Sequence, residues 1–219
     1  MRSPIQGIAR VIAARREALS AHRKLIGDSD SYLYSSGWMA SLERGYPCKS
    51  DGTEVPWMNY CVVSFLEQRL KSDFHLFEYG SGFSTLFFSR LVASVKSVEH
   101  DQQWFERVSA RLPGNVELVL CAEDDDGDYC RTIHRSGRHY DVVIVDGRDR
   151  VNCMKQSLSR LTSRGVLLLD DSQRTEYAPG IALARSEGYL TLDFEGLKPI
   201  SCEVGRTTVM YRRDNCFNI

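Results

Sequence analysis

The feature that most constrains this chain is an alternation of short apolar runs and helical stretches from residue 74 onward. The apolar runs have the length and composition of buried strands, and the segments between them carry apolar residues at helical spacing. Strands that alternate with helices form a parallel sheet with helices on both faces. The predicted strands are 74–80, 95–100, 116–120, 140–147 and 165–171, and the predicted helices are 84–91, 102–112, 154–161 and 179–188.

The last part of the chain departs from this alternation. Residues 189–196 and 207–213 have the pattern of two strands, and the loop between them is too short for a crossover helix. Strands joined in this way pair antiparallel. The sequence therefore predicts an α/β, Rossmann-like, doubly wound fold, with a mostly parallel seven-stranded sheet that ends in a C-terminal antiparallel hairpin.

Residues 1–73 are predicted to form an N-terminal helical extension, or cap, on a core domain formed by residues 74–219. Within the extension, residues 4–26 predict a basic helix of imperfect amphipathicity. Such a helix packs on its own domain, on a partner, or on a membrane surface. Residues 28–56 are rich in turn-forming glycine and proline, and residues 57–71 fit a second helix.

Composition narrows the class of protein further. The 219 residues carry a net charge of −1, whereas a dedicated nucleic-acid binder has a strongly basic balance. The seven cysteines show neither metal-finger nor disulfide-framework spacing, so we expect small buried side chains in a reducing cytoplasm. No apolar stretch reaches the roughly 18 residues of a membrane span. We expect a cytoplasmic protein with no integral membrane segment.

The sharpest motif follows the first predicted strand, in the segment EYGSGFST at residues 78–85. Its two glycines, Gly80 and Gly82, permit a tight strand-to-helix turn and a close approach of the backbone to a ligand. A second acid, Glu99, ends the next strand 21 positions after Glu78. In a Rossmann-type site, a carboxylate at this position accepts hydrogen bonds from ribose hydroxyls.

Two classes of nucleotide-binding enzyme use this layout. A dinucleotide site needs G-x-G-x-x-G, but Thr85 occupies the position of the third glycine. If Glu78 faces the ligand, it would repel a pyrophosphate and attract a cationic amino group. A nicotinamide-dependent oxidoreductase is therefore the weaker alternative, and a non-catalytic scaffold that retains the fold is a second one.

The E-x-G-x-G motif, Glu99 and the terminal hairpin together resemble the class I S-adenosylmethionine (SAM) methyltransferases, over residues 74–213. The resemblance implies that SAM is the cofactor. It places the turn around the methionine moiety, Glu99 at the ribose with His100 beside it, and the loop after the third strand near the adenine. The implied cofactor-binding residues are Glu78, Gly80, Ser81, Gly82, Ser84, Glu99, His100, Ala122, Glu123 and Asp146.

Acidic residues also end the fourth and fifth predicted strands. Asp146 follows one strand, and Asp170 and Asp171 follow its expected neighbour, so the three carboxylates should converge at the carboxyl edge of the sheet. Their repulsion requires a neutraliser, for which Mg²⁺ and the side chains of Arg148 and Arg150 are the two candidates. In a third interpretation, Asp146 shapes the cofactor pocket while the other two cap a helix or form ion pairs.

The arrangement resembles the metal-dependent O-methyltransferases, of both the catechol and the sugar-modifying type. The resemblance implies a divalent metal held by Asp146, Asp170 and Asp171, and the Asp-Asp pair suits the sugar-modifying type better. The lysine base of the catechol type has no counterpart, because Gly147, Arg148 and Asp149 follow Asp146.

Methyl transfer is an in-line displacement that depends mainly on positioning, although a hydroxyl acceptor also benefits from a base. Asp146 is the predicted base, and Arg148 and Asp149 complete the predicted catalytic set. Other candidates for proton transfer are the histidines at positions 100, 134 and 139.

The acceptor is expected to contact residues 1–73 and the stretch 172–180. There Trp38, Trp57 and Tyr60 would form a lid or stack on a sugar ring, or serve as core. The phrases SGW and PW-x-x-Y before the glycine turn resemble small bacterial methyltransferases of surface-polysaccharide gene clusters. We therefore expect O-methylation of a hydroxyl on a small molecule or carbohydrate, with no nucleic-acid partner. Homo-oligomerisation stays open.

Overall fold

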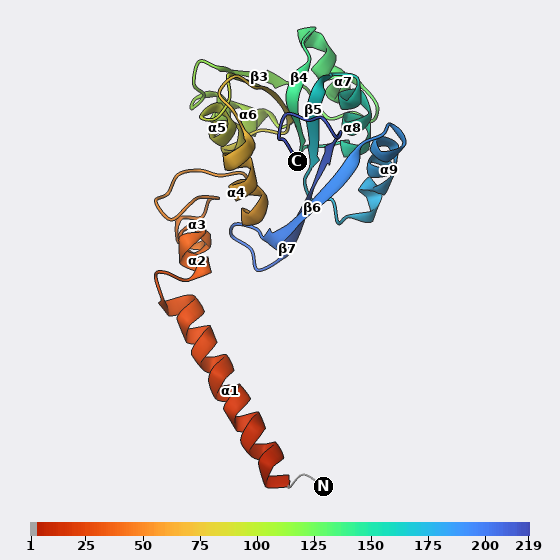
Figure 1. The fold of residues 1–219 in the computed structure, drawn as a ribbon. Coiled ribbons are helices and arrows are strands. Elements are labelled where there is room, and N and C mark those ends of the chain that lie inside the picture. The colour runs from red at the N-terminus through yellow and green to blue at the C-terminus, as the bar shows by residue number, and fades with distance from the viewer. Residues whose placement is uncertain (1–3) are drawn as a thin grey trace.

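The computed structural model describes residues 4–219, with the surroundings of side chains from residue 13 onward. A seven-stranded sheet in the order β3-β2-β1-β4-β5-β7-β6 forms its centre (Figure 1). The strands are β1 His75–Tyr79, β2 Ser94–Glu99, β3 Val116–Leu120, β4 Tyr140–Val145, β5 Leu161–Leu169, β6 Leu190–Leu197 and β7 Val204–Tyr211.

The first five strands run parallel, and β7 pairs antiparallel with both β5 and β6. This confirms the predicted fold class, including the terminal hairpin. It also confirms that the strands ending before Asp146 and Asp170 are direct neighbours.

Alternate residues of the central strands face two separate halves of the core. Leu76 belongs to a cluster that includes residues of α4 (Tyr60–Arg69) and α5 (Phe83–Ser89). Phe77 belongs to the opposite cluster, with residues of α7 (Asp128–Arg131), α8 (Arg150–Leu158) and α9 (Ala178–Ser186). Both faces of the strands are therefore buried, which explains why their sequence reads as continuous apolar runs.

The predicted helices are present, with some differences at their ends. The helix predicted at 102–112 is α6 Gln102–Ser109, and α8 begins at Arg150 rather than at the predicted residue 154. The short α7 and a 3₁₀ helix, Thr132–Ser136, were not predicted. Asp124 explains where α7 begins, because its carboxylate accepts hydrogen bonds from the backbone N–H groups of Asp128 (2.6 Å) and Tyr129 (2.9 Å).

The N-terminal helices differ in how they meet the sheet. Helix α1, Pro4–Gly27, projects away from the body (Figure 1), and its residues 13–27 are exposed. Over these residues, the helix meets the rest of the chain at its C-terminal end, where the Leu25 and Ile26 carbonyls accept hydrogen bonds from Ser31 and Tyr34. Two unpredicted short helices, α2 Tyr32–Ser35 and α3 Trp38–Arg44, lie in the turn-rich stretch. None of the helices in residues 4–219 is long and apolar enough to cross a membrane.

Helix α4 belongs to the packed body. Val62, Val63 and Leu66 are buried in the same cluster as Leu76. Asn59 caps the helix by accepting a hydrogen bond from the backbone of Val62 (3.0 Å), and its side-chain amide donates to the Phe194 carbonyl on β6 (3.0 Å). The helix that leads into the core is therefore joined to the C-terminal hairpin. A division of the chain at residue 73 stays a prediction.

Candidate functional site

A cavity of about 590 Å³ lies at the carboxyl ends of β1, β2 and β4. Of the predicted site residues, Gly80, Ser81, Glu99, His100, Asp146 and Arg148 line it. The cavity is also lined by Trp104, Arg107 and Arg150, none of which was predicted to bind a ligand. Trp104 lies five residues after Glu99, in the first turn of the helix that follows β2. Its position beside the cavity could therefore have been predicted from the sequence.

Glycines at the ends of β1 and β4 shape the cavity floor. Gly80 has φ +95°, and a Cβ there would lie 3.1 Å from the carbonyl oxygen of Asp146. At Gly147 a Cβ would lie 2.1 Å from the Tyr129 hydroxyl and 2.8 Å from the Gly80 nitrogen. The two turns therefore touch, and only glycine fits where they meet.

Glu78 lies behind the glycine turn. Its side chain accepts hydrogen bonds from the hydroxyls of Thr85 (2.6 Å), Ser97 (2.8 Å) and Ser84, and the residue is 1% exposed. Burial raises the pKa of Glu78 to about 7, although the three hydroxyls oppose the rise. Neither Glu78 nor Ser84 lines the cavity, so the visible role of this pair is to hold the turn in place.

Thr85 explains the departure from the three-glycine pattern. Its hydroxyl accepts a hydrogen bond from the Gly82 backbone N–H (3.0 Å) while it donates to Glu78. The start of α5 is therefore capped by the helix's own threonine. Gly82 itself lies under the indole of Trp104, where a Cβ would come within 3.0 Å of the ring.

Glu99 is oriented by hydroxyl and backbone donors, and His100 Nδ1 lies 2.9 Å from its Oε1. One oxygen accepts from the Ser81 hydroxyl (2.8 Å), and the other accepts from the backbone N–H groups of His100 and Asp101, both at 2.9 Å. The residue is 3% exposed but lines the cavity. The indole of Trp104 donates to the Ser81 carbonyl (2.9 Å), which fixes the other side of the turn.

The loop after β3 approaches the cavity only indirectly. Ala122 and Glu123, predicted near the adenine, do not line the cavity. A carboxylate oxygen of Glu123 lies 3.6 Å from Nε of Arg148, and the same Nε donates to His100 Nε2 (3.2 Å). Glu123 is therefore linked to the cavity wall through Arg148.

Asp146 ends β4 at the cavity wall. Its Oδ1 lies 2.9 Å from Arg150 Nη2, and Arg150 also donates to the carbonyls of Asp170 (2.6 Å) and Gly147 (3.0 Å). Burial, reinforced by the charge of Asp170, raises the pKa of Asp146 to about 7 against the effect of Arg150. The carboxyl group is therefore poised between its protonated and ionised forms near neutral pH.

Asp149, although only three residues away, faces elsewhere. Its side chain accepts from Asn152 Nδ2 (2.8 Å) and from the Asp126 backbone N–H (3.1 Å). It does not line the cavity. Of the predicted catalytic set, the structure thus brings Asp146 and Arg148 to the cavity but not Asp149.

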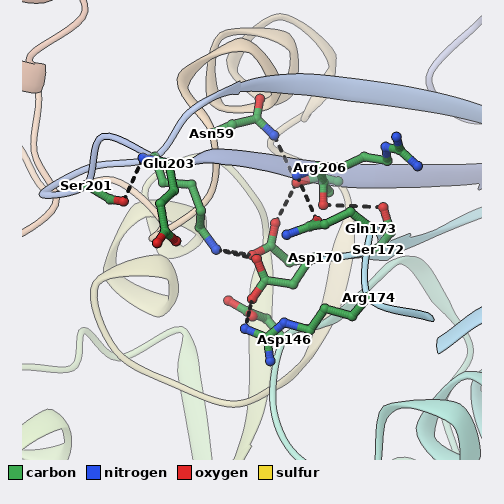
Figure 2. A network of polar contacts seen from close by, with 12 residues as sticks. Asn59, Asp146, Asp170, Ser172, Gln173, Arg174, Ser201, Glu203 and Arg206 are labelled. Carbon is green, nitrogen blue, oxygen red and sulfur yellow. Dashed lines mark hydrogen bonds and ion pairs between the residues drawn. The ribbon is translucent and has the colours of Figure 1, made fainter. Parts of the chain in front are cut away.

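Asp170 and Asp171 end β5 in a network of side-chain donors around Asp170 (Figure 2). Lys198 Nζ lies 3.0 Å from Asp170 Oδ2 and 2.7 Å from Asp171 Oδ1. Burial raises the pKa of Asp170 in spite of Lys198. For Asp171 burial acts in the same direction, but the hydrogen bond and charge of Lys198 outweigh it, so that its pKa is lowered.

The three predicted metal ligands are not grouped as a metal site in the structure, and a bound metal stays a prediction. Among the residues that the structure describes, no three His, Cys, Asp or Glu side chains are grouped so that they would hold a metal ion. The physical reason is that Asp146, Asp170 and Asp171 already face cationic side chains. Arg150 was predicted as an alternative to Mg²⁺ for neutralising the three carboxylates. Lys198 was not predicted.

The remaining candidates lie away from the cavity. His134 contacts Gln156 (2.9 Å) and Arg160 (2.6 Å), and His139 is exposed. Trp38 donates its indole N–H to the Ser201 carbonyl (2.7 Å) and so holds the loop between β6 and β7. Tyr60 is part of the core, and Trp57 is 49% exposed.

Comparisons with known proteins show the fold. No family model matches the sequence, and no curated protein matches it. Among solved structures, an rRNA methylase from Streptococcus thermophilus is 18% identical, with a TM-score of 0.53 over 68% of this chain and 92% of that one. A putative methyltransferase from Streptococcus mutans, in complex with S-adenosylhomocysteine (SAH), is 17% identical, with a TM-score of 0.52 over 68% and 94%.

A third match is the precorrin-6y C5,15-methyltransferase from Geobacter metallireducens, 15% identical, with a TM-score of 0.52 over 70% of this chain and 87% of that one. The part shared with these structures is the Rossmann-like fold. The resemblance to the metal-dependent O-methyltransferases does not appear among these matches.

Proposed function

We propose that this protein is a SAM-dependent methyltransferase that methylates a hydroxyl group on a small molecule or a carbohydrate. The observation that carries the proposal is that Gly80, Glu99 and Asp146 meet around one cavity at the carboxyl edge of the sheet. This edge is where open α/β sheets bind their ligands. The similar solved structures support the same activity class, since two are described as methylases or methyltransferases and a third as a putative one.

The residues around the cavity suit SAM. The buried carboxylate of Glu99 would accept hydrogen bonds from ribose hydroxyls in place of the Ser81 hydroxyl it now holds. Gly80 and Gly147 both line the cavity, where a ligand would meet their backbone without an intervening side chain. When bound, SAM supplies a methyl group on a cationic sulfonium. The carboxylates of Glu99, Asp101 and Asp146 would face that charge from a lining that also carries three arginines.

A dinucleotide suits the cavity less well. A pyrophosphate would need free backbone N–H groups at the start of α5. The Gly82 N–H is already donated to the Thr85 hydroxyl. This observation favours the methyltransferase over the nicotinamide-dependent oxidoreductase.

Asp146 is the proposed general base. It lines the cavity and faces the network around Asp170, so it would border a cofactor bound in the cavity. As the acceptor oxygen attacks the methyl carbon and the carbon–sulfur bond breaks, Asp146 would take the hydroxyl proton. A pKa of about 7 keeps enough carboxylate to do so near neutral pH. Arg148 would line the cofactor side.

The test is calorimetric titration of the wild type with SAM, SAH and NAD⁺, followed by transfer of labelled methyl to a panel of hydroxylated acceptors. We expect SAM and SAH to bind one per chain and NAD⁺ to give no heat. Tight NAD⁺ binding without SAH binding would overturn the proposal. SAH binding without transfer to any acceptor, nucleic acids included, would favour the scaffold instead.

A further inference from the structure

A buried ammonium group sits at the centre of the acidic network beyond Asp146. Lys198 is the first residue of the loop between β6 and β7, and its side chain is 16% exposed. Its Nζ lies within 3.0 Å of both Asp170 and Asp171. One oxygen from each carboxylate therefore points at the same atom.

The other two oxygens of this aspartate pair also have donors. Asp170 Oδ1 accepts from the Thr207 hydroxyl (2.6 Å), and Asp171 Oδ2 accepts from Arg174 (2.8 Å). All four oxygens that could hold a divalent cation are thus engaged by the protein. Asp146, Asp170 and Asp171 face three cationic side chains, those of Arg150, Arg174 and Lys198, so each of the three carboxyl groups has a cationic neighbour.

The fold makes room for the lysine. Strand β7 lies between β5 and β6, which brings the loop that follows β6 to the end of β5. At Gly205 a Cβ would come within 2.5 Å of Cδ of Lys198. A side chain at position 205 would therefore displace the lysine stem, and glycine leaves its path free.

We propose that Lys198 is the resident cation of this site: its ammonium takes the electrostatic place of a divalent metal ion and positions Asp170 and Asp171 beside Asp146. The site consequently works without a metal. Lys198 is a positioning residue, because it acts through the aspartates. The catalytic role of Lys198 rests on the proposed function. Its place as the cation between Asp170 and Asp171 does not.

Removing the ammonium should convert the pair into a weak metal site. Without Lys198, Asp170 Oδ2 and Asp171 Oδ1 would face a common point with an uncompensated charge, and hard divalent cations prefer carboxylate oxygens. The probe is Mn²⁺, and its binding is measured as the loss of the electron paramagnetic resonance signal of the free ion. We expect Lys198→Ala to bind one Mn²⁺ per chain at least tenfold more tightly than the wild type, and the double variant Lys198→Ala/Asp171→Asn to lose that gain.

Two matched variants separate charge from side-chain loss. Lys198→Arg keeps a cation and should gain no Mn²⁺ affinity. Lys155→Ala, an exposed lysine on α8, should behave like the wild type. Equal Mn²⁺ affinity of Lys198→Ala and the wild type would overturn the proposal. So would Mn²⁺ binding by the wild type that Asp171→Asn abolishes, and this titration decides the matter even if Lys198→Ala does not fold.

A second arm uses activity and keeps the two proposals apart. Methyl transfer by the wild type should be unchanged after exhaustive treatment with EDTA, and EDTA-sensitive transfer would overturn the role of Lys198 while leaving the methyltransferase proposal intact. Failure of the wild type to bind SAH would overturn the proposed function. The Mn²⁺ titrations would still test whether Lys198 takes the place of a metal ion.

Discussion

Two groups of acids lie at the same edge of the sheet and are stabilised in different ways. The glutamate pair, Glu78 and Glu99, lies at the carboxyl ends of β1 and β2 and accepts hydrogen bonds from hydroxyls and backbone N–H groups. The aspartate group, Asp146, Asp170 and Asp171, follows β4 and β5 and faces arginine and lysine side chains. One edge therefore carries one group held mainly by hydroxyl and backbone N–H donors, with His100 beside Glu99, and another held mainly by cationic side chains.

The difference indicates a division of labour. A hydroxyl donor such as that of Ser81 can be exchanged for a ligand hydroxyl at little cost, because one neutral hydrogen bond replaces another. A buried ion pair cannot be exchanged in this way, since removing one partner leaves an uncompensated charge. The glutamate side is therefore suited to binding and releasing a cofactor, and the aspartate side to maintaining a fixed electrostatic field around the reaction.

The largest expected effect is on the aspartate side. Asp146→Asn should lower the rate of methyl transfer by about 10²- to 10⁴-fold, because it removes the proposed base. SAH affinity should change by less than about tenfold, since the carboxamide keeps the shape of the cavity wall. Single-turnover kinetics and calorimetry measure the two effects. Asp214→Asn, at an exposed ion pair with Arg164, serves as the control. A rate within about twofold of the wild type would show that Asp146 has no catalytic role.

Lys198→Ala tests how far the aspartate group depends on its cations. The variant should lower the free energy of unfolding by about 3–4 kcal/mol at pH 7, because Asp170 and Asp171 lose their common partner. The lysine lowers the pKa of Asp171 in the folded state. The stabilisation from this ion pair is therefore present above the unfolded pKa of Asp171 and is lost as pH falls through the folded pKa. Urea unfolding should therefore show a smaller loss at pH 2.5, below the unfolded pKa of 3.8, than at pH 7. An equal loss at both pH values would contradict the electrostatic explanation.

Glu78 offers the opposite pH dependence. Its pKa rises from 4.5 to about 7 on folding, so its contribution to stability is present below pH 4.5 and is lost as pH rises through 7. The wild type should lose about 2–3 kcal/mol more than Glu78→Gln between pH 4.5 and pH 8. Urea unfolding of both proteins across this range measures the difference. Parallel pH profiles would mean that folding does not raise the pKa of Glu78.

Glu99→Gln should have the smallest effect of the series. We expect a ten- to thirtyfold loss of SAH affinity, about 1.5–2 kcal/mol, because a charged acceptor for the ribose hydroxyls becomes neutral. Glu117→Gln, on the neighbouring strand β3 in an exposed pair with Lys96, is the matched control and should bind SAH like the wild type. Unchanged affinity in Glu99→Gln would place the ribose elsewhere.

Much of this arrangement was predictable from the sequence because it depends on local patterns. Apolar runs located the strands, and the carboxyl ends of neighbouring parallel strands had to bring Glu99 and Asp146 to one edge. Lys198 was not predictable in the same way. It reaches Asp170 across 28 residues, and only because β7 lies between β5 and β6.

The burial of Glu78 shows a second limit of sequence reasoning. The motif indicated an acid next to a ligand, but three hydroxyls from α5 and β2 turn the carboxyl group away from the cavity. Two of those hydroxyls, Ser84 and Thr85, are part of the motif itself. The spacing of a motif predicts which residues come together, whereas the direction of a side chain depends on the donors that surround it.

The most direct test of this account is a crystal structure of the protein grown with SAH and Mg²⁺. The account predicts ribose hydroxyls on Glu99, the SAH sulfur in the cavity that Gly80 and Asp146 line, and Lys198 rather than Mg²⁺ between Asp170 and Asp171. SAH bound away from this cavity, or a metal ion in the place of the lysine ammonium, would contradict it.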